Sequence, residues 1–191
     1  MRKLVAAVAG VVLALGTAVV AAQAAPASAA PYCGITWGST DKAGDFPSSV
    51  PNPRPSAITN VRAGQQDCYD RLVFDLRSIG ASYRVRYVGT VYHDPRGTPV
   101  PLRGGAKLEI VLPGLPTYDL ETGASTYNPP RPSELVDLTG YQTFRQVAWA
   151  GSFENQTTLG LGVRARLPFR VLYLDGPGAG SRLVIDVAHQ W

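Results

Sequence analysis

Short hydrophobic runs with a period of two constrain the fold of this chain more than any other feature. In one of them, Leu72, Phe74 and Leu76 alternate with more polar neighbours, which is the pattern of a β-strand with one buried face. Gly, Pro and Asp between the runs are typical of turns. The runs lie at residues 71–76, 83–87, 107–112, 143–153, 159–167, 169–174 and 183–187.

Strands at such short intervals favour two packed antiparallel sheets over a barrel or an α/β fold. Only residues 132–138 offer a weak helix candidate. We therefore predict an all-β fold, a two-sheet antiparallel β-sandwich of roughly seven to nine strands in a single domain.

The N-terminus has the organisation of a signal peptide, which we assign to residues 1–29. Arg2 and Lys3 precede an uncharged run over residues 4–22, and small residues follow. Cleavage is expected at Ala29, with a site nearer Ala24 as the alternative. The mature protein is then expected to be secreted or extracellular, in association with the cell wall, with no stable membrane insertion.

The charge of the mature chain argues against nucleic-acid binding. The full chain has 18 Lys and Arg against 14 Asp and Glu. Removal of Arg2 and Lys3 leaves 16 against 14, a net charge of +2. No run of basic residues remains, so we expect no nucleic-acid partner.

Cys33 and Cys68 are the only two cysteines, and an even count in an exported chain predicts one disulfide. Two cysteines and two distant histidines are too few for a metal site, and the chain has no phosphate-binding glycine loop, so no metal or other cofactor is expected. Residues 46–55 read FPSSVPNPRP. We interpret residues 30–57 as an extended, Pro-rich N-terminal segment held in place by Cys33.

Four stretches resemble the AMIN-like domain family of secreted actinobacterial proteins, which is related to the AMIN cell-wall-targeting domain. They are CGITWGS at 33–39, DRLVFDL at 70–76, GLGVRARLPFRV at 160–171 and RLVIDVAH at 182–189. The resemblance implies a β-sandwich domain over residues 58–191 and a secreted, non-catalytic cell-envelope module. AMIN domains help to hold cell-wall amidases at the peptidoglycan, so it also implies peptidoglycan or an anionic wall polymer as a partner.

Two arginine pairs form the first candidate binding surface. Arg84 and Arg86 share one face of their predicted strand, and Arg164 and Arg166 share one face of theirs. If these strands were neighbours, four guanidinium groups would lie on one outer face, suited to carboxylates or phosphates. Gly160 and Gly162 face the same way as Arg164 and Arg166, where a ligand could approach the backbone closely. The alternative is an ordinary solvated sheet face.

Three tyrosines in or beside Pro- and Gly-rich loops form the second candidate. Tyr118, Tyr127 and Tyr141 are the aromatic residues that we expect to be exposed, and they could stack on sugar rings. Most other aromatic residues, including tryptophans, are expected to fill the core of the sandwich.

Catalysis is weakly indicated, because neither His93 nor His189 lies in a known nucleophile or metal motif. The enzymatic alternative is a small hydrolase that uses Asp75 or Asp186 with one of these histidines. Each Asp follows an Arg by four positions in two similar runs, RLVFDL at 71–76 and RLVIDV at 182–187. Cross-strand Arg–Asp pairing explains this pattern more simply, provided that the two strands are neighbours. A protein–protein interaction domain is the third hypothesis, and it predicts an apolar surface patch.

Overall fold

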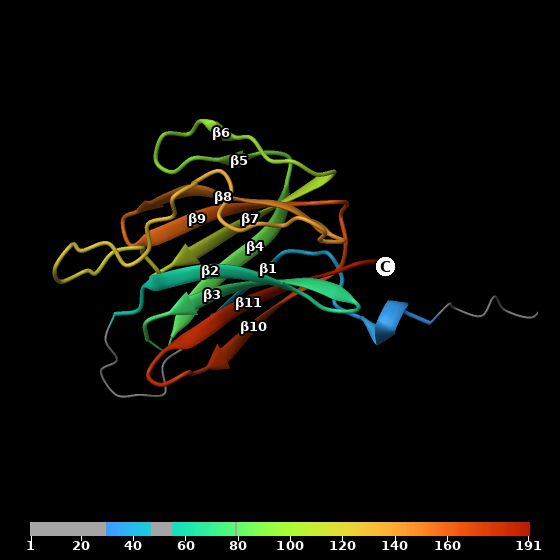
Figure 1. Ribbon diagram of the computed structural model, residues 1–191, viewed down its shortest axis with the longest axis horizontal. Coiled ribbons are helices and arrows are strands. Elements are labelled where there is room, and N and C mark those ends of the chain that lie inside the picture. The colour runs from blue at the N-terminus through green and yellow to red at the C-terminus, as the bar shows by residue number, and fades with distance from the viewer. Residues whose placement is uncertain (1–29, 47–54, 79) are drawn as a thin grey trace, which may run out of the picture.

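The structure is a computed structural model that describes residues 30–46, 55–78 and 80–191 (Figure 1). The predicted signal peptide and most of the Pro-rich stretch at 46–55 lie outside these residues. Within them, no helix is long and apolar enough to cross a membrane.

Two antiparallel sheets pack face to face, which confirms the predicted all-β sandwich (Figure 1). The five-stranded sheet has the order β1 (Lys42–Phe46), β4 (Ala81–Val88), β7 (Ala106–Pro113), β9 (Gln156–Val163) and β8 (Phe144–Phe153). The four-stranded sheet has the order β10 (Phe169–Asp175), β11 (Ser181–Ala188), β3 (Tyr69–Leu76) and β2 (Ile58–Gln65). A small hairpin of β5 (Val91–Tyr92) and β6 (Pro99–Val100) and a short 3₁₀ turn, η1 (Tyr32–Gly34), complete the fold.

The alternating apolar residues form the core between the sheets. Side chains of β3 and β11 face those of β7 and β9, and their burial removes apolar surface from water on both inner faces. The central core residues are Leu72, Phe74, Leu108, Ile110, Leu112, Leu159, Leu161, Leu183, Ile185 and Val187, all fully buried.

The predicted disulfide between Cys33 and Cys68 is present, with 6.2 Å between the two Cα atoms. It ties the N-terminal segment to the connection between β2 and β3. Part of that segment is more regular than the sequence indicated, because residues 42–46 form β1 and pair with β4. The sequence KAGDF has too few apolar residues to show a strand period.

Three further segments differ from the sequence-based expectation. Residues 58–65 form edge strand β2, whose polar outer residues conceal its alternation. Strand β9 ends at Val163, whereas the alternation continued to Leu167. Residues 132–138 contain turns and bends and no helix. There the backbone follows the edge of β8, so contacts to the sheet replace helical hydrogen bonds.

Candidate functional site

The long connection between β7 and β8 lies along the free edge of β8. The Trp149 N–H donates to the carbonyl of Pro132 over 2.7 Å, and the Leu135 N–H donates to the carbonyl of Val147 over 2.9 Å. Because β8 is the last strand of its sheet, these bonds satisfy backbone groups that would otherwise face solvent. They hold the connection against the edge of β8, where side chains from both segments line a common space.

Three aromatic residues meet in that space. Tyr118 and Tyr127 come from the connection and Trp149 comes from β8, and together they line a groove of about 290 Å³. The rings of Tyr127 and Trp149 lie 6.2 Å apart at an angle of 50°. The Tyr118 hydroxyl accepts a hydrogen bond from the Asn155 N–H over 3.1 Å, which orients its ring. Burial raises the pKa of Tyr127, so its hydroxyl stays protonated at neutral pH.

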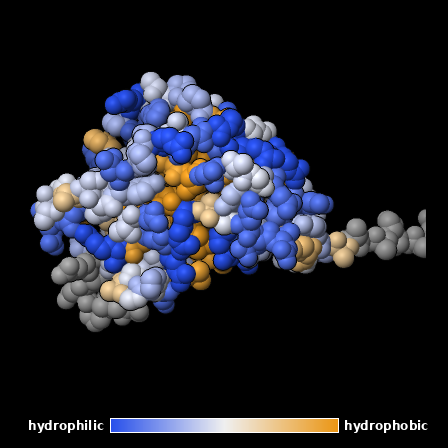
Figure 2. All heavy atoms as spheres, in the orientation of Figure 1, coloured by the Kyte–Doolittle hydropathy of each residue, from blue (hydrophilic) through white to orange (hydrophobic). Residues whose placement is uncertain are grey.

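A second cavity of about 350 Å³ adjoins the first, and Pro132 and Trp149 line both. His93 and Gln146 supply polar groups to the second cavity, beside the apolar surface of Pro101. On the visible face, Figure 2 shows a narrow hydrophobic strip that runs across the sandwich, with hydrophilic residues on both sides. We call the two cavities together the aromatic groove. The groove combines apolar surface with a few polar groups, which is typical of small-ligand sites.

A network around Asp119 holds the loop that contains Tyr118. The Asp119 carboxylate accepts hydrogen bonds from the N–H groups of Thr122 and Glu121, both over 2.9 Å, and forms an ion pair with Arg77. The N–H of Thr122, followed by the Arg77 guanidinium, holds the pKa of Asp119 well below its usual range. The carboxylate is therefore charged at every physiological pH, and the loop is fixed to the body of the sandwich.

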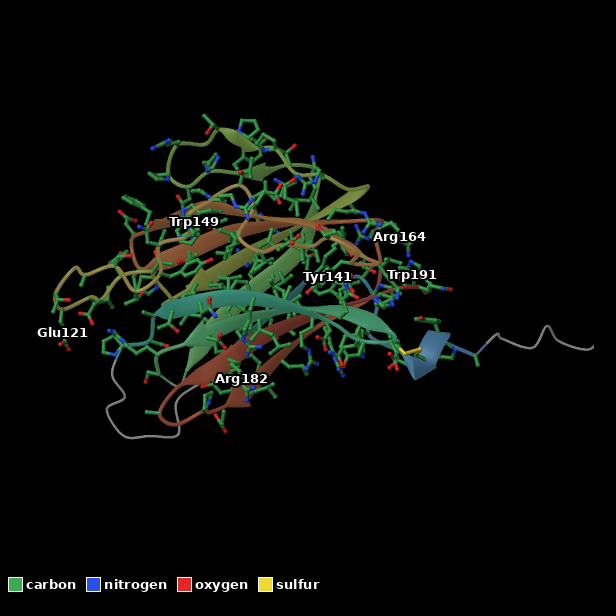
Figure 3. All side chains as sticks on the ribbon, viewed as in Figure 1. Glu121, Tyr141, Trp149, Arg164, Arg182 and Trp191 are labelled. Carbon is green, nitrogen blue, oxygen red and sulfur yellow. A yellow bond between two sulfur atoms is a disulfide. The ribbon has the colours of Figure 1, made fainter. Side chains whose placement is uncertain are left out.

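Tyr141 does not share this groove, although the sequence grouped it with Tyr118 and Tyr127. Its ring stacks on Phe144, with centroids 6.1 Å apart and planes at 5°. Figure 3 labels Tyr141 and Trp149 well apart along the molecule. All three tyrosines lie in or beside Pro- and Gly-rich loop sequence, so the sequence does not distinguish Tyr141 from the two that line the groove.

The four arginines of the first candidate surface do not gather on one face. Strand β7 lies between β4 and β9, so the condition that the two strands be neighbours is not met. Arg84 is exposed and Arg86 pairs with Glu109 of β7. Arg164 and Arg166 follow the end of β9 and bond elsewhere: Arg164 donates to the carbonyl of His189, and Arg166 donates to Ser39 over 3.0 Å. The predicted juxtaposition is wrong, because sheet order depends on pairings that are distant in sequence.

Gly160 and Gly162 do face outward, but the chain itself occupies the space above them. A Cβ atom at Gly160 would overlap Leu102, and one at Gly162 would overlap the backbone of Arg103. The β5–β6 hairpin and the residues after it cover this part of the sheet, with a small apolar cluster beneath. The glycines therefore allow close packing of a neighbouring segment, and the predicted approach of a ligand at this point is replaced by an intramolecular contact.

Asp75 and Asp186, the two carboxylates considered for a hydrolase, both form ion pairs. Strands β3 and β11 are neighbours, and their register places Arg71 opposite Asp186. Asp186 is fully buried and accepts hydrogen bonds from Arg71 over 2.7 Å and from Arg170 over 2.8 Å. This confirms the cross-strand pairing of Arg71 with Asp186. Asp75 is paired with Arg62 of β2 over 2.9 Å instead of with Arg182. Within the described residues, neither histidine forms a hydrogen bond to Asp75 or Asp186.

A buried polar cluster around Asp70 was not predicted. The Asp70 carboxylate accepts the N–H groups of Thr143 over 2.6 Å and Phe144 over 2.8 Å, and lies 3.1 Å from Nε2 of His189. Asp70 is fully buried and His189 is 2% exposed. The cluster connects β3 and the end of β11 to the start of β8, so its geometry fits a structural role. The signal for it was a charged residue at an inward-facing position of a strand.

Metal binding finds no support in residues 30–46, 55–78 and 80–191, where no group of three or more His, Cys, Asp or Glu side chains could hold an ion. His93 lies in a tight turn, where its N–H bonds to Thr98 and its carbonyl accepts from Gly97. This agrees with the turn that the sequence indicates after the preceding strand.

Fold and groove together define a disulfide-bonded β-sandwich module with an aromatic groove along one edge. The profile of the AMIN-like domain family matches residues 56–189, and the chain belongs to that family. Members of the family are cell-wall-related modules, typically extracellular or periplasmic, and are generally non-catalytic binding domains. Searches of curated proteins and of solved structures found no match.

Proposed function

We propose that this protein is a secreted, non-catalytic cell-envelope module that binds the glycan strands of peptidoglycan in the aromatic groove. The observation that supports this most directly is the meeting of Tyr118, Tyr127 and Trp149 in one groove, although Tyr118 and Trp149 are far apart in sequence. Aromatic residues of a small sandwich normally serve as core. Tyr127 and Trp149 do pack against the core, and together with Tyr118 they also line a surface groove.

The chemistry of the groove suits a sugar chain. Flat aromatic rings offer apolar faces to the C–H groups of pyranose rings, and the protonated Tyr127 hydroxyl can exchange hydrogen bonds with sugar hydroxyls. Asn128 and Ser125 add polar groups on the same wall. The two adjoining cavities, about 290 and 350 Å³, extend the site beyond a single cavity, which suits a polymer better than a single sugar.

Co-sedimentation with isolated sacculi tests the proposal. Purified residues 30–191 are mixed with sacculi before and after the anionic wall polymers are stripped off. We expect saturable binding that survives stripping and weakens about tenfold in Tyr127→Ala, equivalent to roughly 1.4 kcal/mol.

Tyr141→Ala is the matched control, because Tyr141 is also a half-buried loop tyrosine stacked on a core-facing ring, but lies outside the groove. It should bind like the wild type. Equal loss in both variants would assign the effect to stability. Binding that disappears on stripping would identify the anionic polymer as the ligand. If no more protein sediments than in an albumin control, a protein partner is favoured.

A further inference from the structure

A third cavity, of about 470 Å³, lies farther along β8 and differs in chemistry from the aromatic groove. Arg103, Arg131 and Arg145 line it together with the carboxylates of Glu134 and Asp137. Residues 131–134 of the connection separate it from the groove: Pro132 and Ser133 line the groove, and Arg131 and Glu134 line the third cavity. We call this third cavity the arginine pocket.

The divider between the two sites is well defined. The buried Gln146 accepts the Arg103 N–H over 2.8 Å and donates to the carbonyl of Ser133 over 2.9 Å. The Arg103 guanidinium then forms a two-point ion pair with Glu134 across the connection. These contacts fix the positions of the groove and the pocket relative to each other along one edge of the molecule.

Two of the three arginines form no ion pair within 4.0 Å in the described part of the chain. Arg103 is neutralised by Glu134. Arg145 donates to the backbone carbonyls of Tyr141, Gln142 and Phe144, which orient its guanidinium and leave its charge uncompensated. Arg131 is exposed, and within residues 30–46, 55–78 and 80–191 it forms no ion pair within 4.0 Å. The pocket therefore presents two cationic groups of the kind that binds carboxylates with two parallel hydrogen bonds.

We propose that the arginine pocket binds the carboxylate of a peptide stem attached to the sugar chain in the aromatic groove. This inference rests on the proposed function and extends it from the sugar chain to its peptide substituent. Residues 131–134 line both sites between them, so a glycan in the groove would place its stem beside the pocket. Val136 and Leu138 in the pocket offer apolar contacts for the short side chains of such a stem.

The acidic residues of the pocket favour a peptide over a phosphate polymer. Oδ1 of Asp137 accepts hydrogen bonds from the N–H and from the hydroxyl of Thr139. These bonds lower the pKa of Asp137, and the nearby charge of Arg131 lowers it further, so the carboxylate is ionised. This negative charge would repel the phosphate groups of an anionic polymer. A stem that contains both a carboxylate and an ammonium group would meet an opposite charge for each.

The test uses soluble glycan fragments of equal length, one set with peptide stems and one set from which an amidase has removed them. Dissociation constants are measured by titration calorimetry for the wild type and Arg131→Glu, with Arg131→Gln as the milder variant. Because Arg131 is exposed, neither substitution disturbs the core. Arg84→Glu, the same charge change at an exposed site on β4, is the control.

We expect the wild type to bind the stem-bearing fragments about tenfold more tightly than the bare glycan. Arg131→Glu should remove this difference without changing affinity for the bare glycan, and Arg84→Glu should change neither value. Equal wild-type affinity for the two sets overturns the pocket but leaves the groove standing. Failure to bind either set overturns the proposed function itself. If Arg131→Glu weakens binding only to a purified anionic wall polymer, the carboxylate assignment is wrong.

Discussion

The two edges of the sandwich contain similar aromatic residues but use them differently. At the edge formed by β1 and β10, Phe46 stacks between Tyr83 and Tyr173, with centroids 5.3 and 5.0 Å apart and planes at 16° in both pairs. We call this the closed edge. At the edge of β8, which we call the groove edge, Tyr127 and Trp149 are tilted at 50° and line a cavity.

The difference lies in the backbone that covers each edge. At the closed edge β1 is a regular strand, and its alternation sends Phe46 inward between the sheets. At the groove edge the covering segment contains Pro129, Pro130 and Pro132, which cannot continue a strand ladder. The irregular backbone leaves a cavity beside the rings, although Phe46 and Tyr127 are both half-buried. Residue type alone therefore does not separate packing aromatics from binding aromatics.

Asp70 gives the largest expected effect, because it holds the groove edge from inside. Asp70→Ala leaves the N–H groups of Thr143 and Phe144 and the ring of His189 without their acceptor in a fully buried site. We expect a loss of about 3–5 kcal/mol in the free energy of unfolding, measured by urea denaturation. Asp45→Ala, an exposed position on β1, should stay close to the wild type. Comparable losses in both would contradict the role assigned to the buried cluster.

Phe46→Ala is expected to have the next largest effect, and it compares the two edges directly. The loss of both stacking partners should lower the free energy of unfolding by roughly 2–3 kcal/mol, less than for a fully buried Phe because Phe46 is half-buried.

Tyr127→Ala should lower the free energy of unfolding less than Phe46→Ala does. In binding to sacculi the order should reverse, with the larger loss of affinity in Tyr127→Ala. Both are measured by urea denaturation and by co-sedimentation of the same preparations. If Phe46→Ala impaired binding as strongly as Tyr127→Ala while still folded, the two edges would not be independent, and the distinction drawn between them would fail.

Much of the fold could be predicted from the sequence, because strands such as β3 and β7 bury one apolar face and leave a more polar one partly exposed. The disulfide could be predicted because the sequence contains only two cysteines. Strand β1 could not be predicted, because its sequence has almost no apolar alternation and it forms by pairing with β4. The order of strands was also beyond reach, and with it the separation of Arg84 from Arg164.

The candidate site was predictable only in part. Tyr118 and Tyr127 were expected to be exposed because of the Pro and Gly residues around them, and the structure places both in the groove. Trp149 was grouped with the aromatic residues expected to fill the core, and it does pack against the core. That it also lines the groove could not be predicted, because nothing local shows that β8 is an edge strand. Asp70 stands out in the sequence only as a charged residue at an inward-facing position of a strand. Its role could not be recognised, because its partners Thr143 and His189 are 73 and 119 positions away.

The smallest predicted effect concerns Asp119, which holds only one loop of the groove edge. Its pKa lies below the ordinary value in the folded state, so its contribution to stability is present above the unfolded pKa of about 4 and is lost as the pH falls through the depressed folded-state value. Between pH 5 and pH 8 the carboxylate stays charged, and its hold on the Tyr118 loop should not vary. Asp119→Asn removes the charge that pairs with Arg77 but retains an oxygen acceptor for the N–H groups of Glu121 and Thr122. We therefore expect a loss of only about twofold in affinity for sacculi, constant over this pH range, with binding isotherms at several pH values as the measurement. A loss as large as that in Tyr127→Ala would mean that the position of the Tyr118 loop, more than the ring of Tyr127, determines binding at the groove edge.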